Sequence, residues 1–109
     1  MKIVIDGREF NGQSNVAEWY DLAYPGDNWG RDVINRGITF QDVFECLDNK
    51  ANIYAFLGGV DSIIRERVFD ALATMMEVNY DVVYYQWLKR SNGDRQLHKD
   101  LKKLRFRVS

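Results

Sequence analysis

The sequence predicts one domain of the α+β class, mostly helical, with four to six short helices and a small sheet. Apolar residues recur at helical spacing over most of the chain. Three helix starts carry N-cap signals, at Thr39, Asp61 and Asn79. The first residues are largely β-branched and lead into a turn signal, which predicts the sheet. With 109 residues and 46% hydrophobic content, the chain can bury one core, so we expect a single domain over residues 1–109.

The N-terminal segment has the pattern of a hairpin. Residues 2–5 are followed by Asp6-Gly7 and then by Arg8-Glu9-Phe10. An Asp-Gly pair between two such runs is a strong hairpin signal. We therefore expect a small hairpin, or one strand and a turn, before a break at Asn11-Gly12.

Two helices are expected next. The first is capped by Ser14 or Asn15 and ends before Pro25-Gly26. A shorter helix then spans residues 28–36 and stops at Gly37. The buried face of the first helix follows the i, i+3, i+4, i+7 pattern and consists of Val16, Trp19, Tyr20 and Ala23.

Thr39 gives the sharpest helix start, because Asp42 completes a variant capping box with it. We expect this helix to end at Asn49-Lys50. Asn52 then caps a single turn that stops at Gly58-Gly59. The buried face of the helix is formed by Phe40, Val43, Phe44 and Leu47.

The longest helix is expected over about residues 62–77, after Asp61. Another helix runs from the cap at Asn79 through Arg90 and is apolar on nearly all sides. Such a helix is either central in the fold or in contact with a partner. The long helix is expected to turn Ile64, Val68, Ala71, Leu72 and Met75 toward the core and Arg65, Glu66, Asp70 and Glu77 outward.

The C-terminal segment combines two patterns. Residues 94–104 carry leucines at helical spacing, with Asp94 as the cap. Residues 104–108 alternate apolar and basic side chains, which is a strand pattern that could pair with residues 2–5. Across the chain we expect a core that includes Trp19, Phe44, Leu47, Ile64, Val68, Leu72, Val83 and Trp87.

Charge is divided along the chain, although the whole chain is nearly neutral, with 15 basic and 16 acidic residues. Residues 1–88 contain 7 basic and 14 acidic side chains, whereas residues 89–109 contain 8 basic and 2 acidic ones. The basic end can contact phosphates or an acidic protein surface, or be a solvated face neutralised by the acidic half. The acidic half can in turn engage a basic partner, or simply keep the chain soluble. The candidate cations are Lys89, Arg90, Arg95, Lys99, Lys102, Lys103, Arg105 and Arg107.

No catalytic, metal or cofactor motif is visible. His98 is the only histidine and stands among cations, which makes it a poor general base, while a structural zinc site needs about four Cys or His ligands. Gly58-Gly59 lacks the Lys-Ser/Thr pair of a phosphate loop. We therefore expect a protein that is not an enzyme and binds no cofactor. The carboxylates at helical spacing, Asp42, Glu45 and Asp48, are expected to form a solvated face.

The single cysteine, Cys46, cannot form an internal disulfide, and its amphipathic surroundings predict a buried, unreactive thiol. The chain shows neither a signal-peptide pattern nor an apolar run long enough to cross a membrane. Together these observations favour the cytoplasm, without membrane contact.

Residues 72–88 resemble a helix-turn-helix of the phage-repressor type. Ala73, Val78 and Val83 match its small first-helix residue, its apolar turn residue and its buried second-helix residue. The sequence departs from the motif at Glu77, where the turn glycine is expected, and in its aromatic second helix. The resemblance implies that Tyr84, Gln86, Lys89 and Arg90 face DNA.

The whole chain also resembles the small accessory proteins of bacteriophages and mobile elements, such as anti-CRISPR inhibitors. It shares their short length, aromatic richness and lack of catalytic motifs. The resemblance implies a non-enzymatic protein that binds and blocks a bacterial host or defence protein or nucleoprotein. The alternatives are a DNA-binding regulator that uses the basic C-terminal segment and a homo-oligomeric structural protein. The expected partner-binding residues are the basic residues named above and three tyrosines that can serve as anchors: Tyr80, Tyr84 and Tyr85.

Overall fold

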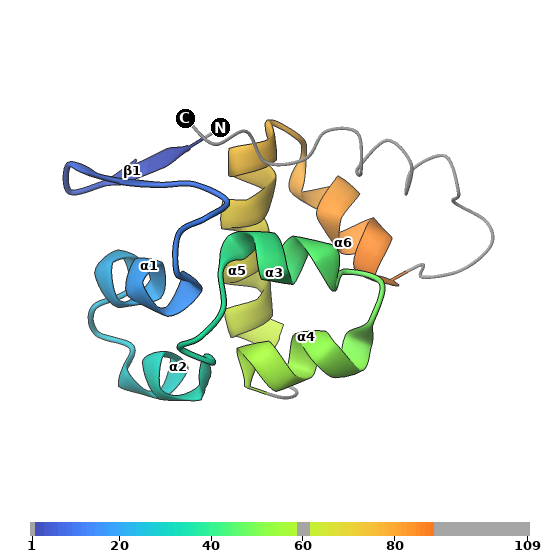
Figure 1. Cartoon of the computed structure of the whole chain (residues 1–109), viewed down its shortest axis with the longest axis horizontal. Helices are drawn as coiled ribbons and strands as arrows, with labels where there is room; N and C mark the ends of the chain where they lie inside the picture. The colour runs from blue at the N-terminus through green and yellow to red at the C-terminus, as the bar shows by residue number, and fades with distance from the viewer. Residues whose placement is uncertain (1, 59–61, 89–109) are drawn as a thin grey trace.

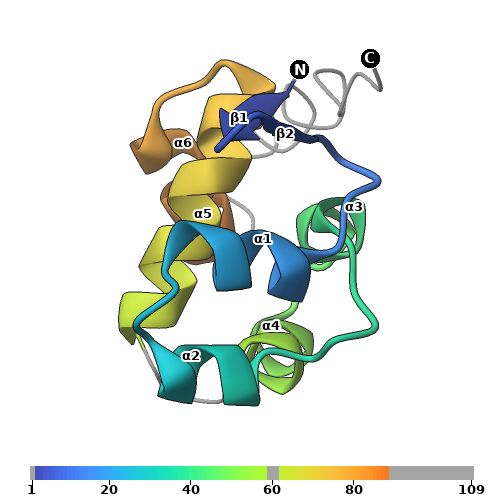
Figure 2. The ribbon, with the colours of Figure 1, turned by 90° about the vertical axis from the view of Figure 1, so that its left-hand side faces the viewer.

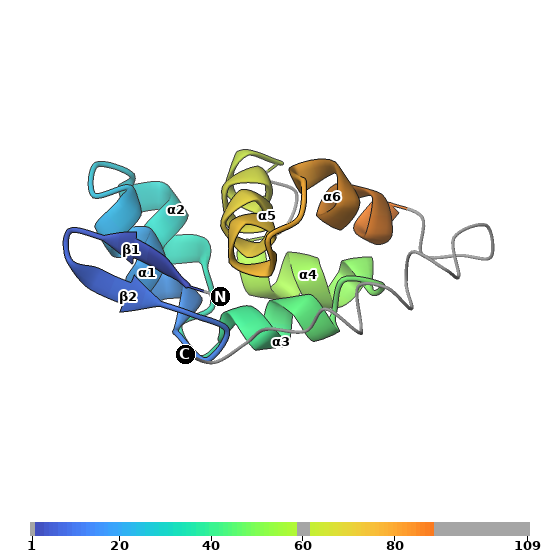
Figure 3. The ribbon, with the colours of Figure 1, turned by 90° about the horizontal axis from the view of Figure 1, so that it is seen from above.

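The computed structural model describes residues 2–58 and 62–88, which form a mostly helical α+β fold (Figure 1). The elements are β1 (Ile3–Ile5), β2 (Arg8–Phe10), α1 (Val16–Ala23), α2 (Asn28–Val33), α3 (Phe40–Glu45), α4 (Lys50–Leu57), α5 (Ser62–Met76) and α6 (Tyr80–Leu88). The long helix α5 runs through the middle of the molecule. The hairpin, α1 and α2 lie on one side of it and α6 on the other, while α3 and α4 cover a third side (Figures 1 and 3). This confirms the predicted fold class.

The predicted hairpin is present. β1 and β2 pair in antiparallel register, with Ile3 opposite Phe10 and Ile5 opposite Arg8. Asp6 and Gly7 connect them, with φ angles of 50° and 80°, and two left-handed residues are what a type I′ turn requires. The expected third strand, residues 104–108, and the expected helix over residues 94–104 lie outside the described part of the chain.

Local capping chemistry places several helix starts where they were predicted. The side chain of Asn15 accepts a hydrogen bond from the Glu18 N–H at 2.9 Å, so Asn15 rather than Ser14 caps α1. Thr39 and Asp42 form the reciprocal capping box of α3. The Asn79 side chain accepts from the N–H of Asp81 at the start of α6.

Two predicted helix ends are wrong. The helix after residue 28 ends at Val33 rather than near Gly37, because the buried Ile34 turns to extended backbone with ψ of 129°. The Asn35 N–H then donates to the carbonyl oxygen of Phe56 instead of continuing the helix. Asn49 does not end α3, which stops at Glu45.

Asn49 is instead the N-cap of α4, because its side chain accepts a hydrogen bond from the Asn52 N–H at 3.2 Å. A helix of eight residues therefore stands where a single turn capped by Asn52 was predicted. Gly58 ends it in the left-handed conformation, with φ of 81°.

The core lies between α5 and the helices around it (Figure 2). Ile64, Val68, Ala71, Leu72 and Met75 of α5 are all buried, as predicted. The eight residues predicted for the core of the whole domain are buried too: Trp19, Phe44, Leu47, Ile64, Val68, Leu72, Val83 and Trp87.

Candidate interaction surface

A tight turn folds α6 back onto α5. The Val78 N–H donates to the carbonyl of Ala73 at 3.0 Å, and the Glu77 N–H donates to the carbonyl of Thr74 at 3.2 Å. This is the Schellman pattern, which needs a left-handed residue after the helix, and Glu77 supplies it with φ of 57°. The turn therefore has the backbone that the helix-turn-helix resemblance expects, although the residue is not glycine.

The sides of α6 differ in exposure. Val83, Gln86 and Trp87 are buried against the core, whereas Tyr85 and Leu88 are 38% and 44% exposed. The expected outward position of Gln86 is therefore wrong, because this side chain is only 6% exposed. A residue at that depth does not present a base-reading group at the surface.

A row of aromatic rings connects this helix to its neighbours. Tyr80 stacks on Tyr84 with ring centroids 5.9 Å apart, and Tyr84 lies 5.8 Å from Trp87. Trp87 makes edge-on contacts with Tyr54 of α4 and Phe69 of α5. Such pairs stabilise packing beyond the area that they bury. The α6 surface is defined as the half-buried Tyr80 and Tyr84 together with the exposed Tyr85 and Leu88.

Burial, followed by the nearby carboxylate of Glu66, raises the pKa of Tyr80. The phenol therefore stays protonated near neutral pH. It can act as a hydrogen-bond donor and acceptor at the edge of the α6 surface.

Two cations lie against Trp87 from other helices. The Cζ atom of Arg65, on α5, is 4.2 Å from a Trp87 ring centroid, and Nζ of Lys50, at the start of α4, is 4.8 Å away. Arg65 is half-buried, so its expected outward position is wrong. The attraction of a cation to the indole face explains why it folds onto α6 instead.

A separate, partly buried network links α1, the start of α2 and α5. Arg67 Nη1 donates to Asp27 Oδ2 at 2.6 Å and to the Tyr20 hydroxyl oxygen at 2.7 Å, while that hydroxyl donates to Asp27 Oδ2 at 2.6 Å. The Tyr20 hydroxyl and the Gly30 N–H lower the pKa of Asp27, and burial raises the pKa of Tyr20 to about 12. Arg67 also borders an open groove of about 480 Å³ between β1, α1 and α5. Its charge is already paired with Asp27, so we treat this network as structural.

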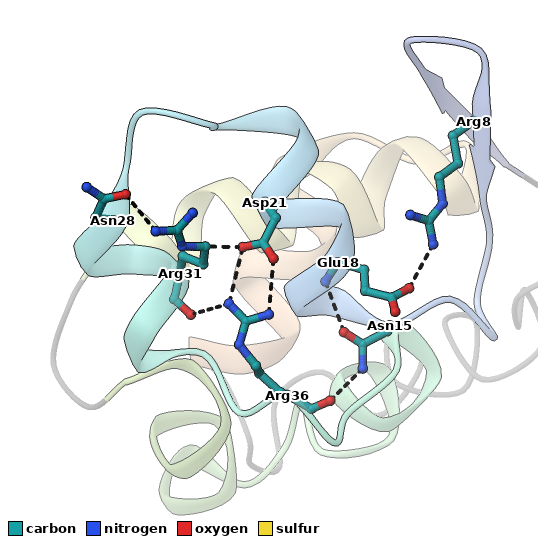
Figure 4. Close-up of polar contacts among 7 residues, drawn as sticks. All are labelled: Arg8, Asn15, Glu18, Asp21, Asn28, Arg31 and Arg36. Carbon is teal, nitrogen blue, oxygen red and sulfur yellow. Dashed lines mark hydrogen bonds and ion pairs between the residues drawn. The ribbon is translucent and has the colours of Figure 1, made fainter.

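A further polar network covers the outer face of α1 and α2 (Figure 4). Arg36 donates to both carboxylate oxygens of Asp21, at 3.0 and 3.3 Å, and to the carbonyl of Arg31. The Asn15 amide in turn donates to the Arg36 carbonyl at 2.7 Å. These bonds hold the segment after α2 against α1, and their charged groups are paired with one another.

The structure brings together some of the predicted partner-binding residues. Tyr80, Tyr84 and Tyr85 share α6, but only Tyr85 is exposed. The sequence did not predict a partner-binding role for Lys50, Arg65 or Leu88. Its only signals for them are a cation near the start of a helix, for Lys50 and Arg65, and an apolar residue near the end of one, for Leu88. The basic residues lie outside the described residues, as does His98: Lys89, Arg90, Arg95, Lys99, Lys102, Lys103, Arg105 and Arg107.

Two other groups considered in the sequence are Cys46 and the carboxylates of α3. Cys46 is half-buried, and burial raises the pKa of its thiol, which disfavours the reactive thiolate. Asp42 accepts a hydrogen bond from the Thr39 N–H, so it caps α3 rather than being only part of a solvated face. Within residues 2–58 and 62–88, no group of three or more His, Cys, Asp or Glu side chains is placed to hold a metal ion.

None of the helices in the described ranges is long and apolar enough to cross a membrane. Comparisons with protein-family models, with curated proteins and with solved structures found no match.

Proposed function

We propose that this chain is a non-enzymatic protein-binding domain and that its partner docks on the α6 surface. The observation that carries the proposal is the exposure of Tyr85 and Leu88 on one side of α6, beside the half-buried Tyr80 and Tyr84. Tyrosines flanked by apolar side chains are typical anchors of protein interfaces. The other exposed large apolar side chains of the described ranges lie on three separate elements, β1, α2 and the start of α5: Val4, Trp29 and Ile63.

We propose more specifically that the partner is a bacterial host or defence protein or nucleoprotein, which the chain inhibits in the cytoplasm. The support is the resemblance to phage accessory proteins, together with the single cysteine and the absence of catalytic motifs from the sequence.

The alternative function is DNA binding through residues 72–88 and the basic C-terminal segment. The left-handed turn at Glu77 favours it, since the helix-turn-helix motif needs such a turn. The burial of Gln86 weighs against it, as does the acidic excess of residues 1–88, which would repel a duplex lying across them.

Complex formation tests the proposal. A bacterial protein recovered on the immobilised full chain would be purified separately, mixed with the full chain and analysed by gel filtration. We expect a complex that Leu88→Glu disrupts, because a charge would be desolvated at the interface. Ile63→Glu, at a side chain that is 56% exposed on α5, is the matched control and should leave the complex intact.

Two other outcomes would contradict the proposal. A gel shift showing tight, sequence-selective binding to DNA at about 0.15 M salt would support the regulator instead. Gel filtration of the chain alone that shows a dimer, which Leu88→Glu separates into monomers, would assign the α6 surface to a second copy.

A further inference from the structure

Two basic side chains of the described ranges are not used in ion pairs, and they contact the same residue. Five others pair with carboxylates, at distances from 2.6 to 3.9 Å: Lys2, Arg8, Arg31, Arg36 and Arg67. Lys50 and Arg65 make no such pair within residues 2–58 and 62–88, and both lie over Trp87. Neither cation therefore has a carboxylate partner among the described residues, although acidic side chains outnumber basic ones two to one in residues 1–88.

Buried donors at the same place also lack acceptors. Nε of Arg65 and Nε1 of Trp87 are inaccessible to solvent and have no hydrogen-bond partner among the described residues, and Trp87 is only 4% exposed. A buried N–H group without an acceptor is destabilising, because the group has lost its hydrogen bonds to water. Within residues 2–58 and 62–88, the cluster therefore has donors without acceptors and cations without a paired carboxylate.

We propose that Lys50, Arg65 and Trp87 form the binding site for an acidic segment of the protein partner, which places a carboxylate against the two cations. The inference rests on the proposed function, because Trp87 adjoins the α6 surface through its 5.8 Å contact with Tyr84. A carboxylate accepts charge-assisted hydrogen bonds from both guanidinium and ammonium groups. The partner would thus cover the tyrosines with apolar side chains and meet the cations with an Asp or Glu.

The surrounding charge favours a short acidic segment of a protein over nucleic acid. Glu66 is exposed and follows Arg65 directly, so the positive field around the cluster is narrow. A single carboxylate needs only local contact with Lys50 and Arg65. A duplex would extend past them over the acidic body and be repelled.

The test is a titration of the full chain with a polyglutamate peptide, followed by NMR. The resonances to observe are the indole N–H of Trp87 and the Nε–H of Arg65. We expect both to shift and saturate with polyglutamate and to stay unchanged with polyglutamine. The variant Lys50→Gln/Arg65→Gln should bind about tenfold more weakly or worse, which corresponds to the loss of one charge-assisted contact.

Two control variants show whether weaker peptide binding comes from loss of the site, from the lower net charge or from disturbed packing on Trp87. Lys2→Gln/Arg8→Gln removes the same charge from two exposed residues of the hairpin and should bind like the parent chain. Lys50→Arg/Arg65→Lys keeps both charges and should retain most of the affinity even if the packing on Trp87 relaxes.

Three results would overturn the inference. The first is that polyglutamate shifts neither the Trp87 nor the Arg65 resonance. The second is that Lys2→Gln/Arg8→Gln weakens polyglutamate binding as much as Lys50→Gln/Arg65→Gln does. The third is that a duplex DNA shifts the Trp87 indole resonance at a lower concentration than the peptide. The titration needs no natural partner. If polyglutamate does not bind but the partner complex still forms in gel filtration, this site is rejected and the proposed function stands. Saturable binding of the peptide without any partner complex would instead reject the proposed function and leave the site standing.

Discussion

At the scale of single residues, Glu77 holds a backbone conformation that suits glycine better. Its φ of 57° places it in the left-handed region, which costs a residue with a Cβ atom about 1–2 kcal/mol. We expect Glu77→Gly to raise the free energy of unfolding by about 0.5–1 kcal/mol, after allowing for the greater freedom of glycine in the unfolded chain. Urea denaturation measures this. Glu77→Ala keeps the Cβ atom and should gain less, and an equal gain would show that backbone strain is not the cause.

Tyr20 should make the protein sensitive to alkali. Burial, and then its hydrogen bond to Asp27, raises the pKa of Tyr20 from 10.0 to about 12. Between these values the unfolded chain loses the Tyr20 proton while the folded chain keeps it. The stabilisation is therefore complete below pH 10 and falls by about 2–3 kcal/mol as the pH approaches 12. Tyr20→Phe should flatten this part of the curve of urea midpoint against pH, and an unchanged slope would contradict the assignment.

At the scale of elements, the contact between α1 and α2 depends on the smallness of Gly30. A Cβ atom at this position would lie 2.5 Å from the Tyr20 hydroxyl oxygen, which is closer than real Cβ contacts come. Tyr20 cannot easily retreat, because its hydroxyl is bonded to both Asp27 and Arg67. We therefore expect Gly30→Ala to lower the free energy of unfolding by about 1–3 kcal/mol. Gly26→Ala is the control for thermal denaturation, since a Cβ atom there has nothing within 4 Å, and an equal loss in it would exclude the clash as the cause.

Elements that depend on neighbours in the sequence were predictable, and those that depend on distant packing were not. The capping box of Thr39 and Asp42 needs only residues of one turn, so the sequence specifies it. The end of α2 was predicted wrongly, because the burial of Ile34 and the bond from the Asn35 N–H to the carbonyl oxygen of Phe56 depend on packing against a distant segment.

In the candidate site, too, the features set by local sequence were predictable and those set by distant packing were not. The apolar excess of α6 predicted a helix that is either central in the fold or in contact with a partner. Val83 and Trp87 are buried, whereas Tyr85 is exposed, and contact with a partner stays a prediction. The burial of Gln86 and the folding of Arg65 onto Trp87 depend on how α4, α5 and α6 pack together, which spacing along the chain does not reveal.

At the scale of the whole molecule, stability depends on a few large aromatic side chains in one core. Trp19 is 3% exposed and makes edge-on contacts with Tyr20, Tyr24 and Phe40. Truncating such a residue to alanine costs about 3–5 kcal/mol, a large part of the 5–15 kcal/mol that stabilises a typical domain. We expect Trp19→Ala to leave much of the chain unfolded by circular dichroism.

Trp29→Ala is the matched control for the core substitution, because the same side chain is removed where it is 55% exposed. Its effect on the free energy of unfolding should stay within about 0.5 kcal/mol. Equal losses from the two substitutions would show that Trp19 does not have the central place in the core that its contacts indicate.

The Tyr20–Asp27–Arg67 network has a consequence for how the chain is made. Arg67 follows Asp27 by 40 residues and Tyr20 by 47, so a ribosome releases the acid and the phenol well before their cation. Until α5 emerges, α1 and α2 lack both the apolar face of that helix and the charge that neutralises Asp27. We expect nascent chains that end before residue 67 to remain open to proteases along α1 and α2. Protection should then appear over a short interval of further synthesis, as α5 leaves the exit tunnel.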